Sequence, residues 1–352
     1  MSNDIKTLCA TDDYSFREIM SLIDRGGIGI ALLVDSAGVF LRTITDGDLR
    51  RGILAGFDLS TTLQEMPPNE QPSITAPADT PAEKQQWIMR NRGIRHLPLL
   101  NDDGTVADLA QATGFVTDQL PMQAVIMAGG FGTRLRPLTD STPKPMLQIG
   151  GKPLMQRTIE NLQRAGISRI HVTTHYLPEK ITGHFGDGHQ FGVDINYVTE
   201  EIPMGTAGAL RLLNHIDEPL LVINGDILTH VDFGSLSRFH QEHKAALTVA
   251  VRQYDVQVPY GVVESTDGVV HSLREKPRFH FQVNAGIYKL EPFACRYIPK
   301  SGRYDMTDLI DALLQADETV VGFPITEYWL DIGQHDDFRQ AQEDATQQRW
   351  AA

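Results

Sequence analysis

The first 120 residues carry the same order of hydrophobic and polar positions twice, with an offset of 66. The stretch from Asp13 to Gly38 aligns with the stretch from Asp79 to Gly104. Each predicts an amphipathic helix, a glycine turn, a short apolar strand, a hairpin turn and a second strand. We therefore expect an α+β domain at 1–120, made of half-units at about 1–65 and 66–120.

A different pattern begins after residue 120. From Gln123 onward, apolar strands such as Ala124 to Met127 and Leu220 to Ile223 alternate with amphipathic helices. This alternation predicts a three-layer α/β domain at 121–352 with a mostly parallel, mixed sheet, and further β-structure near residues 258–272. Ligands of open α/β sheets bind beyond the carboxyl ends of the strands, so the loops that follow these strands are the first places to look for a site.

Composition narrows the class of protein. A length of 352 residues suits two domains, and 41% hydrophobic with 22% charged residues allows a packed core. The formal net charge of -14 argues against a broad nucleic-acid surface. The N-terminus has no export signal, and no apolar run approaches the roughly 20 residues of a membrane span. With only two cysteines, Cys9 and Cys295, we expect a reduced, cytoplasmic protein that does not bind membranes.

The loop after the first α/β strand has the chemistry of a phosphate site. Glycines let main-chain N–H groups approach phosphate oxygens, and arginine supplies paired donors. The loop lacks the Gly-Lys-Ser/Thr of a P-loop, and its arginines and the Pro-Lys-Pro around Lys144 do not fit a dinucleotide fingerprint. The candidate phosphate residues are Ala128, Gly129, Gly130, Gly132, Thr133, Arg134 and Lys144.

Two carboxylates far apart in the chain are candidate metal ligands. Asp226 follows a buried strand in Asn-Gly-Asp, and Asp331 precedes a glycine turn and a helix in Trp-Leu-Asp-Ile-Gly. Oxygen ligands suit Mg²⁺, which can also bind nucleotide phosphates. The sequence therefore predicts that Asp226 and Asp331 converge on one Mg²⁺.

The order of these motifs resembles that of the sugar-1-phosphate nucleotidyltransferases, over roughly 220 residues from Gln123. The resemblance implies a Rossmann-like nucleotidyltransferase domain that makes an NDP-sugar for surface glycan synthesis and releases pyrophosphate. It implies catalytic roles for Arg134, Lys144 and the lysine of Glu-Lys-Pro, Lys276. The wording of the glycine loop is most similar to mannose- or heptose-1-phosphate guanylyltransferases.

The same resemblance places the substrates. It implies nucleotide contacts from Glu200, Gly205 and Thr206 in addition to the glycine loop, and sugar contacts from Gly225, Glu275 and Asn284. A carboxylate at Glu200 can accept hydrogen bonds from the N1–H and amino group of guanine, which favours GTP. Thymine and uracil also present an N–H, so a dTTP-, UTP- or CTP-using enzyme stays open. A catalytically silent sugar-nucleotide-binding regulator is the other alternative.

The repeated N-terminal unit resembles a tandem pair of CBS domains, which bind adenosine nucleotides. The family's ribose-binding pattern falls on Thr45 and Asp48, while the equivalent positions of the second half are Gln111 and Gly114. One site for AMP or ATP is therefore expected. An equally open interpretation is that Thr45 and Asp48 only cap a helix. The resemblance also implies a homo-oligomer.

Overall fold

The computed structural model describes residues 5–26, 28–66, 72–112, 120–213 and 216–347. Contacts within the chain divide it into two units, residues 1–118 and residues 119–352. None of the helices in the described ranges is long and apolar enough to cross a membrane.

The first unit repeats one arrangement of strands and helix. In each half a short strand runs parallel to the middle strand, which pairs with an antiparallel third strand. The helix, middle strand and third strand of the two halves differ by the same 66-residue offset. The first half contains β1 (Cys9–Ala10), α1 (Phe16–Gly26), β2 (Ile30–Val34), β3 (Phe40–Thr45) and α2 (Asp46–Leu54). The second contains β4 (Ala76–Pro77), α3 (Ala82–Arg92), β5 (His96–Leu100) and β6 (Val106–Gln111).

The two halves share buried contacts. Leu32 of β2 and Leu109 of β6 belong to one hydrophobic cluster, and Val39 forms an isolated antiparallel bridge with Thr105. Gln111 ends β6, whereas Gly114 lies outside the described residues.

The second unit is built on a seven-stranded sheet with the order β11-β10-β7-β12-β17-β14-β18. β17 is antiparallel to both of its neighbours, and all the other pairings in this sheet are parallel. The predicted fold class, a three-layer α/β domain with a mostly parallel sheet, is confirmed. The strands are β7 (Gln123–Met127), β10 (Arg169–Thr174), β11 (Asp194–Thr199), β12 (Leu220–Asn224), β14 (Leu247–Gln257), β17 (Arg278–Leu290) and β18 (Val320–Ile325).

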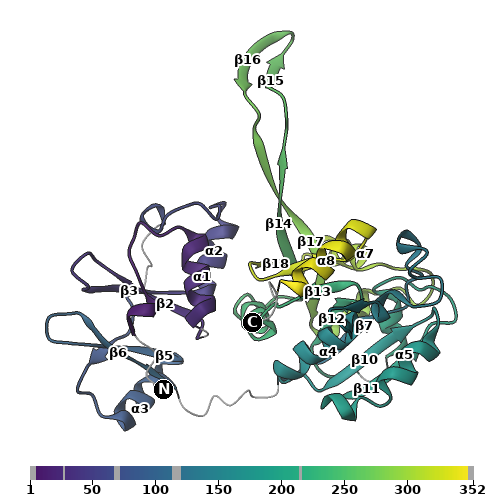
Figure 1. The fold of residues 1–352 in the computed structure, drawn as a ribbon, viewed down its shortest axis with the longest axis horizontal. Coiled ribbons are helices and arrows are strands. Elements are labelled where there is room, and N and C mark those ends of the chain that lie inside the picture. The colour runs from purple at the N-terminus through teal and green to yellow at the C-terminus, as the bar shows by residue number, and fades with distance from the viewer. Residues whose placement is uncertain (1–4, 27, 67–71, 113–119, 214–215, 348–352) are drawn as a thin grey trace. The chain divides into compact units, whose positions relative to one another are not determined.

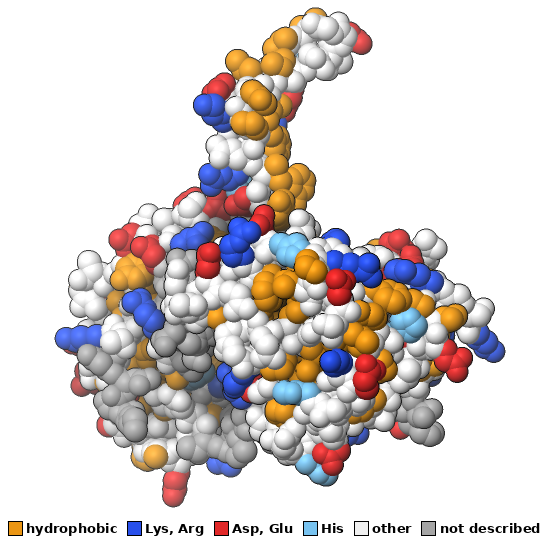
Figure 2. Space-filling model, turned by 45° about the vertical axis from the view of Figure 1, so that its right-hand side comes forward, with side chains coloured by type: hydrophobic (Ala, Val, Ile, Leu, Met, Phe, Trp, Pro, Cys, Tyr) orange, Lys and Arg blue, Asp and Glu red, His pale blue; other side chains and the backbone are white. Residues whose placement is uncertain are grey.

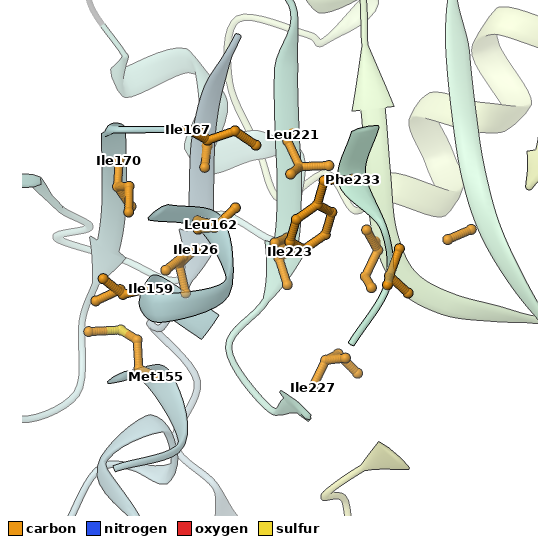
Figure 3. Close-up of a cluster of buried hydrophobic side chains, with 14 of the residues drawn as sticks. Ile126, Met155, Ile159, Leu162, Ile167, Ile170, Leu221, Ile223, Ile227 and Phe233 are labelled. Atoms are coloured by element: carbon orange, nitrogen blue, oxygen red, sulfur yellow. The ribbon is translucent and has the colours of Figure 1, made fainter. Parts of the chain in front are cut away.

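Both faces of this sheet are buried, which explains why its strands read as continuous apolar runs. Ile126 belongs to the cluster on the face covered by α4 and α6, whereas Val125 belongs to the cluster on the face covered by α7. Figure 3 shows the first cluster, where Phe233 lies against Leu221 and Ile223. The helices are α4 (Leu154–Arg164), α5 (Pro178–Phe185), α6 (Phe233–Glu242), α7 (Met306–Gln315) and α8 (His335–Thr346).

Two features outside the main sheet matter for the site. The strands β13 (Ile227–Thr229) and β19 (Trp329–Asp331) form a small antiparallel pair. β14 and β17 continue beyond the sheet as a two-stranded ribbon that ends in the hairpin of β15 (Val262–Thr266) and β16 (Val269–Arg274). Figure 1 shows this ribbon projecting from the unit. A further short pair is formed by β8 (Gln148–Ile149) and β9 (Lys152–Pro153).

Candidate active site

The site begins where two neighbouring parallel strands end. β7 and β12 pair in register up to Met127 and Asn224. Immediately after them, the Gly225 N–H donates to the Met127 carbonyl at 2.9 Å. A Cβ at Gly225 would lie 2.5 Å from that carbonyl oxygen, so only glycine fits this approach. Gly225 thereby fixes where the following residue, Asp226, leaves the sheet.

Asp226 and Asp331 are brought together by the small strand pair. Ile227 pairs with Asp331 across β13 and β19, and the Ile332 N–H donates to the Asp226 carbonyl at 3.0 Å. Burial raises the pKa of the Asp331 carboxyl, and the nearby Asp226 carboxylate raises it further. The two acidic groups, 105 positions apart in the sequence, therefore occupy one electrostatic site.

Two cations lie in the same site. Lys144 follows Pro143 in a short 3-10 helix, and its Nζ lies 2.5 Å from Asp226 Oδ2. Lys144 and Arg134 both act to lower the pKa of Asp331, against the stronger effect of burial. A Cβ at Gly333 would lie 3.7 Å from both Arg134 Nη1 and Asp331 Oδ1. Arg134, Lys144, Asp226 and Asp331 thus form one cluster of two cations and two carboxylates.

One buried carboxylate oxygen of this cluster suits a divalent cation. Asp226 Oδ1 is buried and has no hydrogen-bond partner in the described part of the chain. An unpaired buried carboxylate oxygen is costly, and a hard cation bound by oxygen ligands relieves that cost. No group of three or more His, Cys, Asp and Glu with metal-site geometry occurs in the described ranges. A cation here would therefore complete its shell with water or substrate oxygens.

The glycine loop after β7 presents its backbone beside this cluster. A Cβ added to Gly130 would meet nothing within 4 Å, so the backbone there faces open space. Gly132 has φ +62°, and a Cβ there would lie 2.9 Å from Thr139 Cγ2. The Ala128 N–H donates to the Thr173 carbonyl at 3.0 Å, which ties the loop to β10. Thr133 begins a short 3-10 helix that includes Arg134.

Glu200 packs directly against this loop. A Cβ at Gly129 would lie 2.8 Å from Glu200 Oε1. The Glu200 side chain is buried, and its Oε2 accepts from the Met204 N–H at 2.8 Å. His175 Nδ1 lies 2.7 Å from the Glu200 carbonyl oxygen. The structure thus brings the predicted base-recognition carboxylate together with the predicted phosphate loop.

The neighbouring segment with Gly205 and Thr206 is anchored on the start of α7. The Thr206 N–H donates to Asp305 Oδ1 at 3.0 Å, and its hydroxyl accepts from the Met306 N–H at 2.9 Å. Asp305 was not among the candidates from sequence. It is the N-cap of α7, and a capping aspartate gives no sequence signal that distinguishes it from other helix caps.

Asn284 lies on β17 near the carboxyl end of β12. Its Oδ1 accepts from the Gly286 N–H at 2.9 Å, and its amide donates to the Tyr288 hydroxyl at 2.8 Å. Gly286 packs on Asn224, because a Cβ there would lie 2.6 Å from Asn224 Nδ2. Asn224 Oδ1 is buried without a hydrogen-bond partner among the described residues. Asn224, which immediately precedes Gly225, was also missed from sequence.

Glu275 and Lys276 lie elsewhere. They are in the loop between β16 and β17, on the outer part of the ribbon, and both are exposed. Arg278 pairs with Gln257, whereas Asn284 pairs with Val251. The six residue steps from Arg278 to Asn284 correspond to about 20 Å along an extended strand. The structure therefore does not bring Glu275 and Lys276 together with Asn284 and the acidic pair.

In the first unit, Thr45 and Asp48 form a complete helix cap at α2. The Thr45 N–H and hydroxyl donate to Asp48 Oδ2, at 2.8 and 2.6 Å, and the Asp48 N–H donates back to the Thr45 hydroxyl at 3.3 Å. Arg51 Nη2 donates to the other carboxylate oxygen at 2.7 Å. Both candidate ligand-binding side chains are therefore satisfied within α2 and its cap.

Comparison with known families identifies the class of protein to which this fold belongs. The nucleotidyl transferase family model matches residues 123–348, and the CBS domain model matches residues 68–111. The chain belongs to the nucleotidyl transferase family, and it carries a CBS domain in its N-terminal unit. The predicted resemblance to the nucleotidyltransferases is confirmed, and the CBS match falls on residues 68–111 of the predicted second half-unit.

Two individual relatives are similar to part of this chain. The chain is 33% identical over 227 residues to a mannose-1-phosphate guanyltransferase of Candida albicans, a match covering 62% of each chain. It is 34% identical over 230 residues to a probable mannose-1-phosphate guanylyltransferase 3 of Oryza sativa subsp. japonica, covering 62% of this chain and 63% of the relative. The match thus spans less than two thirds of these relatives.

Solved structures share the fold of the second unit. A putative glucose-1-phosphate thymidylyltransferase from Bacillus anthracis is 25% identical, with a TM-score of 0.53, over 64% of this chain and 95% of that one. HddC from Yersinia pseudotuberculosis complexed with GMP-PN is 26% identical, with a TM-score of 0.50, over 63% of this chain and 98% of that one.

Proposed function

We propose that this protein transfers a nucleoside monophosphate, GMP in preference to others, from an NTP to a sugar 1-phosphate. The observation that carries the proposal is the cluster of Arg134, Lys144, Asp226 and Asp331 at the carboxyl ends of β7 and β12. Two cations and a carboxylate pair beside an open glycine backbone suit a substrate that carries several phosphate charges.

The reaction needs no side-chain nucleophile. An oxygen of the sugar 1-phosphate attacks the α-phosphorus of the nucleotide. The bond from that phosphorus to the α–β bridging oxygen breaks, and pyrophosphate leaves with the electron pair. The chain's contribution is to hold both reactants in line and to balance the charge that develops on the leaving oxygens.

Each element has a separate task in this scheme. In the proposal, the backbone at Gly130, where a Cβ would meet open space, and the Arg134 guanidinium bind the triphosphate, because N–H groups are suitable donors to phosphate oxygens. Lys144, held by Asp226 at 2.5 Å, supplies a positive charge next to the reacting phosphates. Asn284 and Gly225 lie at the sugar end of the site, beside Asn224 and Gly286.

Asp226 and Asp331 would hold Mg²⁺. The unpaired Asp226 Oδ1 and the raised pKa of Asp331 support this proposal, because a divalent cation would lower the electrostatic cost of both. When bound there, Mg²⁺ supplies charge neutralisation at the phosphate oxygens.

The preference for guanine rests on Glu200. The buried carboxylate packs against Gly129, the first glycine of the predicted phosphate loop, and this proximity supports its contact with the base of a nucleotide bound there. The resemblance to mannose-1-phosphate guanylyltransferases and the GMP-PN complex of HddC support the same base. We infer a mannose-like sugar from the guanylyltransferase relatives, and the resemblance of the glycine loop leaves a heptose open.

A substrate matrix tests this proposal directly. GTP, dTTP, UTP, CTP and ATP are each combined with mannose-, heptose- and glucose-type sugar 1-phosphates, and pyrophosphate release is measured with Mg²⁺. We expect the highest kcat/KM for GTP with a mannose-like sugar. A preference for dTTP would overturn the assignment of guanine but would agree with the proposed reaction. Absence of turnover for every pair would support a silent binding protein.

Glu275 and Lys276 retain their predicted roles as sugar and phosphate contacts in this proposal. In the structure they lie beyond Arg278, which is itself about 20 Å along the ribbon from Asn284. They reach the sugar phosphate only if the ribbon bends toward the acidic pair. Lys276→Met is expected to raise the KM for the sugar 1-phosphate and to leave GTP affinity unchanged; an unchanged KM would remove Lys276 from the site.

We also propose that AMP or ATP binds the N-terminal unit at Thr45 and Asp48 and alters turnover. The site lies at the N-terminus of α2, which favours anions. Because the cap already uses both side chains, ribose must displace or share these hydrogen bonds. AMP titration followed by calorimetry on the full chain tests this, with Asp48→Asn expected to weaken binding at least tenfold. If the wild type binds neither AMP nor ATP, the role of Thr45 and Asp48 is to cap the helix.

A further inference from the structure

Glu200 differs from two other predicted substrate contacts in being held inside the second unit. Glu275 and Lys276 lie on the ribbon that Figure 2 shows projecting from this unit, whereas Glu200 is buried. Its Oε2 accepts from the Met204 N–H at 2.8 Å, and its Oε1 accepts no hydrogen bond from the described part of the chain. Residues 201–203 are exposed and lie in no helix or strand. The orientation of this carboxylate therefore depends on what holds Met204.

The loop at residues 204–208 is fastened to the backbone that leads into α7. The Tyr304 N–H donates to the Met204 carbonyl at 2.8 Å. The Tyr304 carbonyl accepts from the Ala207 and Gly208 N–H groups, at 3.0 and 2.8 Å. These three hydrogen bonds join two segments that are far apart in the sequence. The position of the loop is therefore determined by the residues before α7.

Asp305 adds a side-chain hydrogen bond to this backbone contact. Its Oδ1 accepts from the Thr206 N–H at 3.0 Å, and its Oδ2 accepts from Arg303 Nε at 3.2 Å. The next residue, Met306, donates its N–H to the Thr206 hydroxyl at 2.9 Å. Hydrogen bonds to an ionised acceptor are stronger than those between neutral groups. Asp305 therefore holds the middle of the loop more firmly than backbone contacts alone would.

The fold around Asp305 has further supports. The Asp305 N–H donates to Asp308 Oδ2 at 2.8 Å, within the first turn of α7. Arg211, which follows the loop, donates to the Pro299 and Gly302 carbonyls, at 2.5 and 2.7 Å. These contacts do not use the Asp305 carboxylate. Its removal should therefore loosen the loop without unfolding it.

We propose, on the basis of the function proposed above, that Asp305 is a positioning residue for recognition of the base. Its carboxylate holds Thr206, and the loop that contains Thr206 presents the Met204 N–H that orients Glu200. In the proposed function, the Glu200 carboxylate accepts from the N1–H and the 2-amino group of guanine. Accepting from two neighbouring donors requires a fixed carboxylate, so a looser loop should weaken discrimination for the 2-amino group.

GTP and ITP test this proposal, because inosine lacks only the 2-amino group of guanosine. Calorimetry on the full chain with Mg²⁺ gives both dissociation constants. We expect the wild type to bind GTP about tenfold more tightly than ITP, since the missing donor pairs with a charged acceptor. In Asp305→Ala this ratio should fall to about threefold or less. Asp305→Asn should restore it, because its Oδ1 can still accept from the Thr206 N–H.

Asp232→Ala is the matched control for the loss of a helix cap. Asp232 caps α6 by accepting from the Gly234 and Ser235 N–H groups, at 2.8 and 3.0 Å. None of its hydrogen bonds within the described ranges involves residues 204–208. Asp232→Ala should lower the unfolding temperature and keep the GTP-to-ITP ratio of the wild type. A similar loss of this ratio in both alanine variants would mean that Asp305 acts only through general stability.

Thr206→Val tests the same contact from the other side, should Asp305→Ala fail to fold. This variant loses the hydroxyl that accepts from the Met306 N–H, and its GTP-to-ITP ratio should also fall. If the wild type discriminates and these variants discriminate equally well, Asp305 has no positioning role, although the proposed function stands. If the wild type binds GTP and ITP equally, the assignment of guanine to Glu200 is wrong as well.

Discussion

Lys144 Nζ lies 2.5 Å from Asp226 Oδ2, so the lysine of Pro-Lys-Pro and the aspartate after β12 meet although 82 residues separate them. The Asp226 carboxylate has its second oxygen buried and unpaired. One carboxylate thus orients the Lys144 ammonium group with one oxygen and leaves the other for a further ligand.

Removing either partner should lower kcat strongly. Lys144→Met deletes the charge beside the reacting phosphates, and Asp226→Asn deletes the carboxylate that orients it. Loss of one such electrostatic group costs about 10²–10³-fold in kcat. Pyrophosphate release at saturating substrates measures this loss. Lys152→Met is the control, because Lys152 pairs with Glu160 on the surface; near-normal activity of the Lys144 and Asp226 variants would remove the cluster from catalysis.

Nucleotide binding should depend on Mg²⁺ through Asp226. We expect calorimetry to show at least tenfold weaker binding of a non-hydrolysable GTP analogue to the wild type when EDTA replaces Mg²⁺. In Asp226→Ala this difference should largely vanish, because the ligand with the free oxygen is gone. Asp336→Asn is the control, since Asp336 is exposed and pairs with Arg339. A full Mg²⁺ effect in Asp226→Ala would place the metal elsewhere.

The parts of this molecule that the sequence predicts well are those determined locally. The run of apolar residues before Ala128 and before Asp226 identifies each strand end, and a parallel sheet places such ends together. Asp331 follows the same logic, because a carboxylate before a glycine turn is a local signal. Proximity of Asp226 and Asp331 then follows from one short strand pair, whose register the chain's pattern does not specify.

The parts that escaped prediction depend on contacts between distant segments. Asp305 accepts a hydrogen bond from the Thr206 N–H, 99 positions away in the sequence. The residues around Asp305 in the sequence indicate only a helix cap. Asn224 is distinguished by the close approach of Gly286, which requires the antiparallel β17. The direction of the ribbon that carries Glu275 and Lys276 also depends on contacts between distant segments. The alternation of side chains along its strands is the same whether the ribbon covers the site or points away from it.

Two glycines with nearly the same φ allow the stability cost of close packing to be distinguished from the cost of backbone strain. Gly205 and Gly302 have φ of +85° and +86°. A Cβ at Gly205 would lie 2.5 Å from the Tyr304 carbonyl oxygen, whereas one at Gly302 would meet nothing within 4 Å. Gly302→Ala should therefore cost about 1–2 kcal/mol of unfolding free energy. Gly205→Ala should cost about 1–3 kcal/mol more, because backbone must move.

Calorimetric unfolding of the two alanine variants measures this difference, and nucleotide affinity reports its consequence. Because Gly205 adjoins the segment that begins with Glu200, Gly205→Ala should also weaken GTP binding. Gly302→Ala should leave GTP binding near the wild-type value. Equal losses of stability in the two variants would show that the left-handed conformation, rather than the contact with Tyr304, accounts for the cost.

Lys289 provides a pH-dependent test of the core beneath α6. Its side chain is buried and donates to Ser237 Oγ at 2.7 Å, close to His240 and Glu291. Burial lowers the pKa of Lys289 from 10.5 to about 8, against the attraction of Glu291. Between these two values the unfolded chain binds more protons than the folded chain, so stability rises with pH across this window.

Lys289→Met should abolish that rise. The wild type is expected to gain up to about 3 kcal/mol in unfolding free energy from pH 8 to pH 10.5 relative to Lys289→Met. Taking the difference between the two proteins cancels the titration of other groups that both share, including Cys295. Urea unfolding at several pH values measures it, with the exposed Lys300→Met as control. Parallel stability curves for wild type and Lys289→Met would mean that Lys289 keeps its proton throughout this range, held by Ser237 and Glu291.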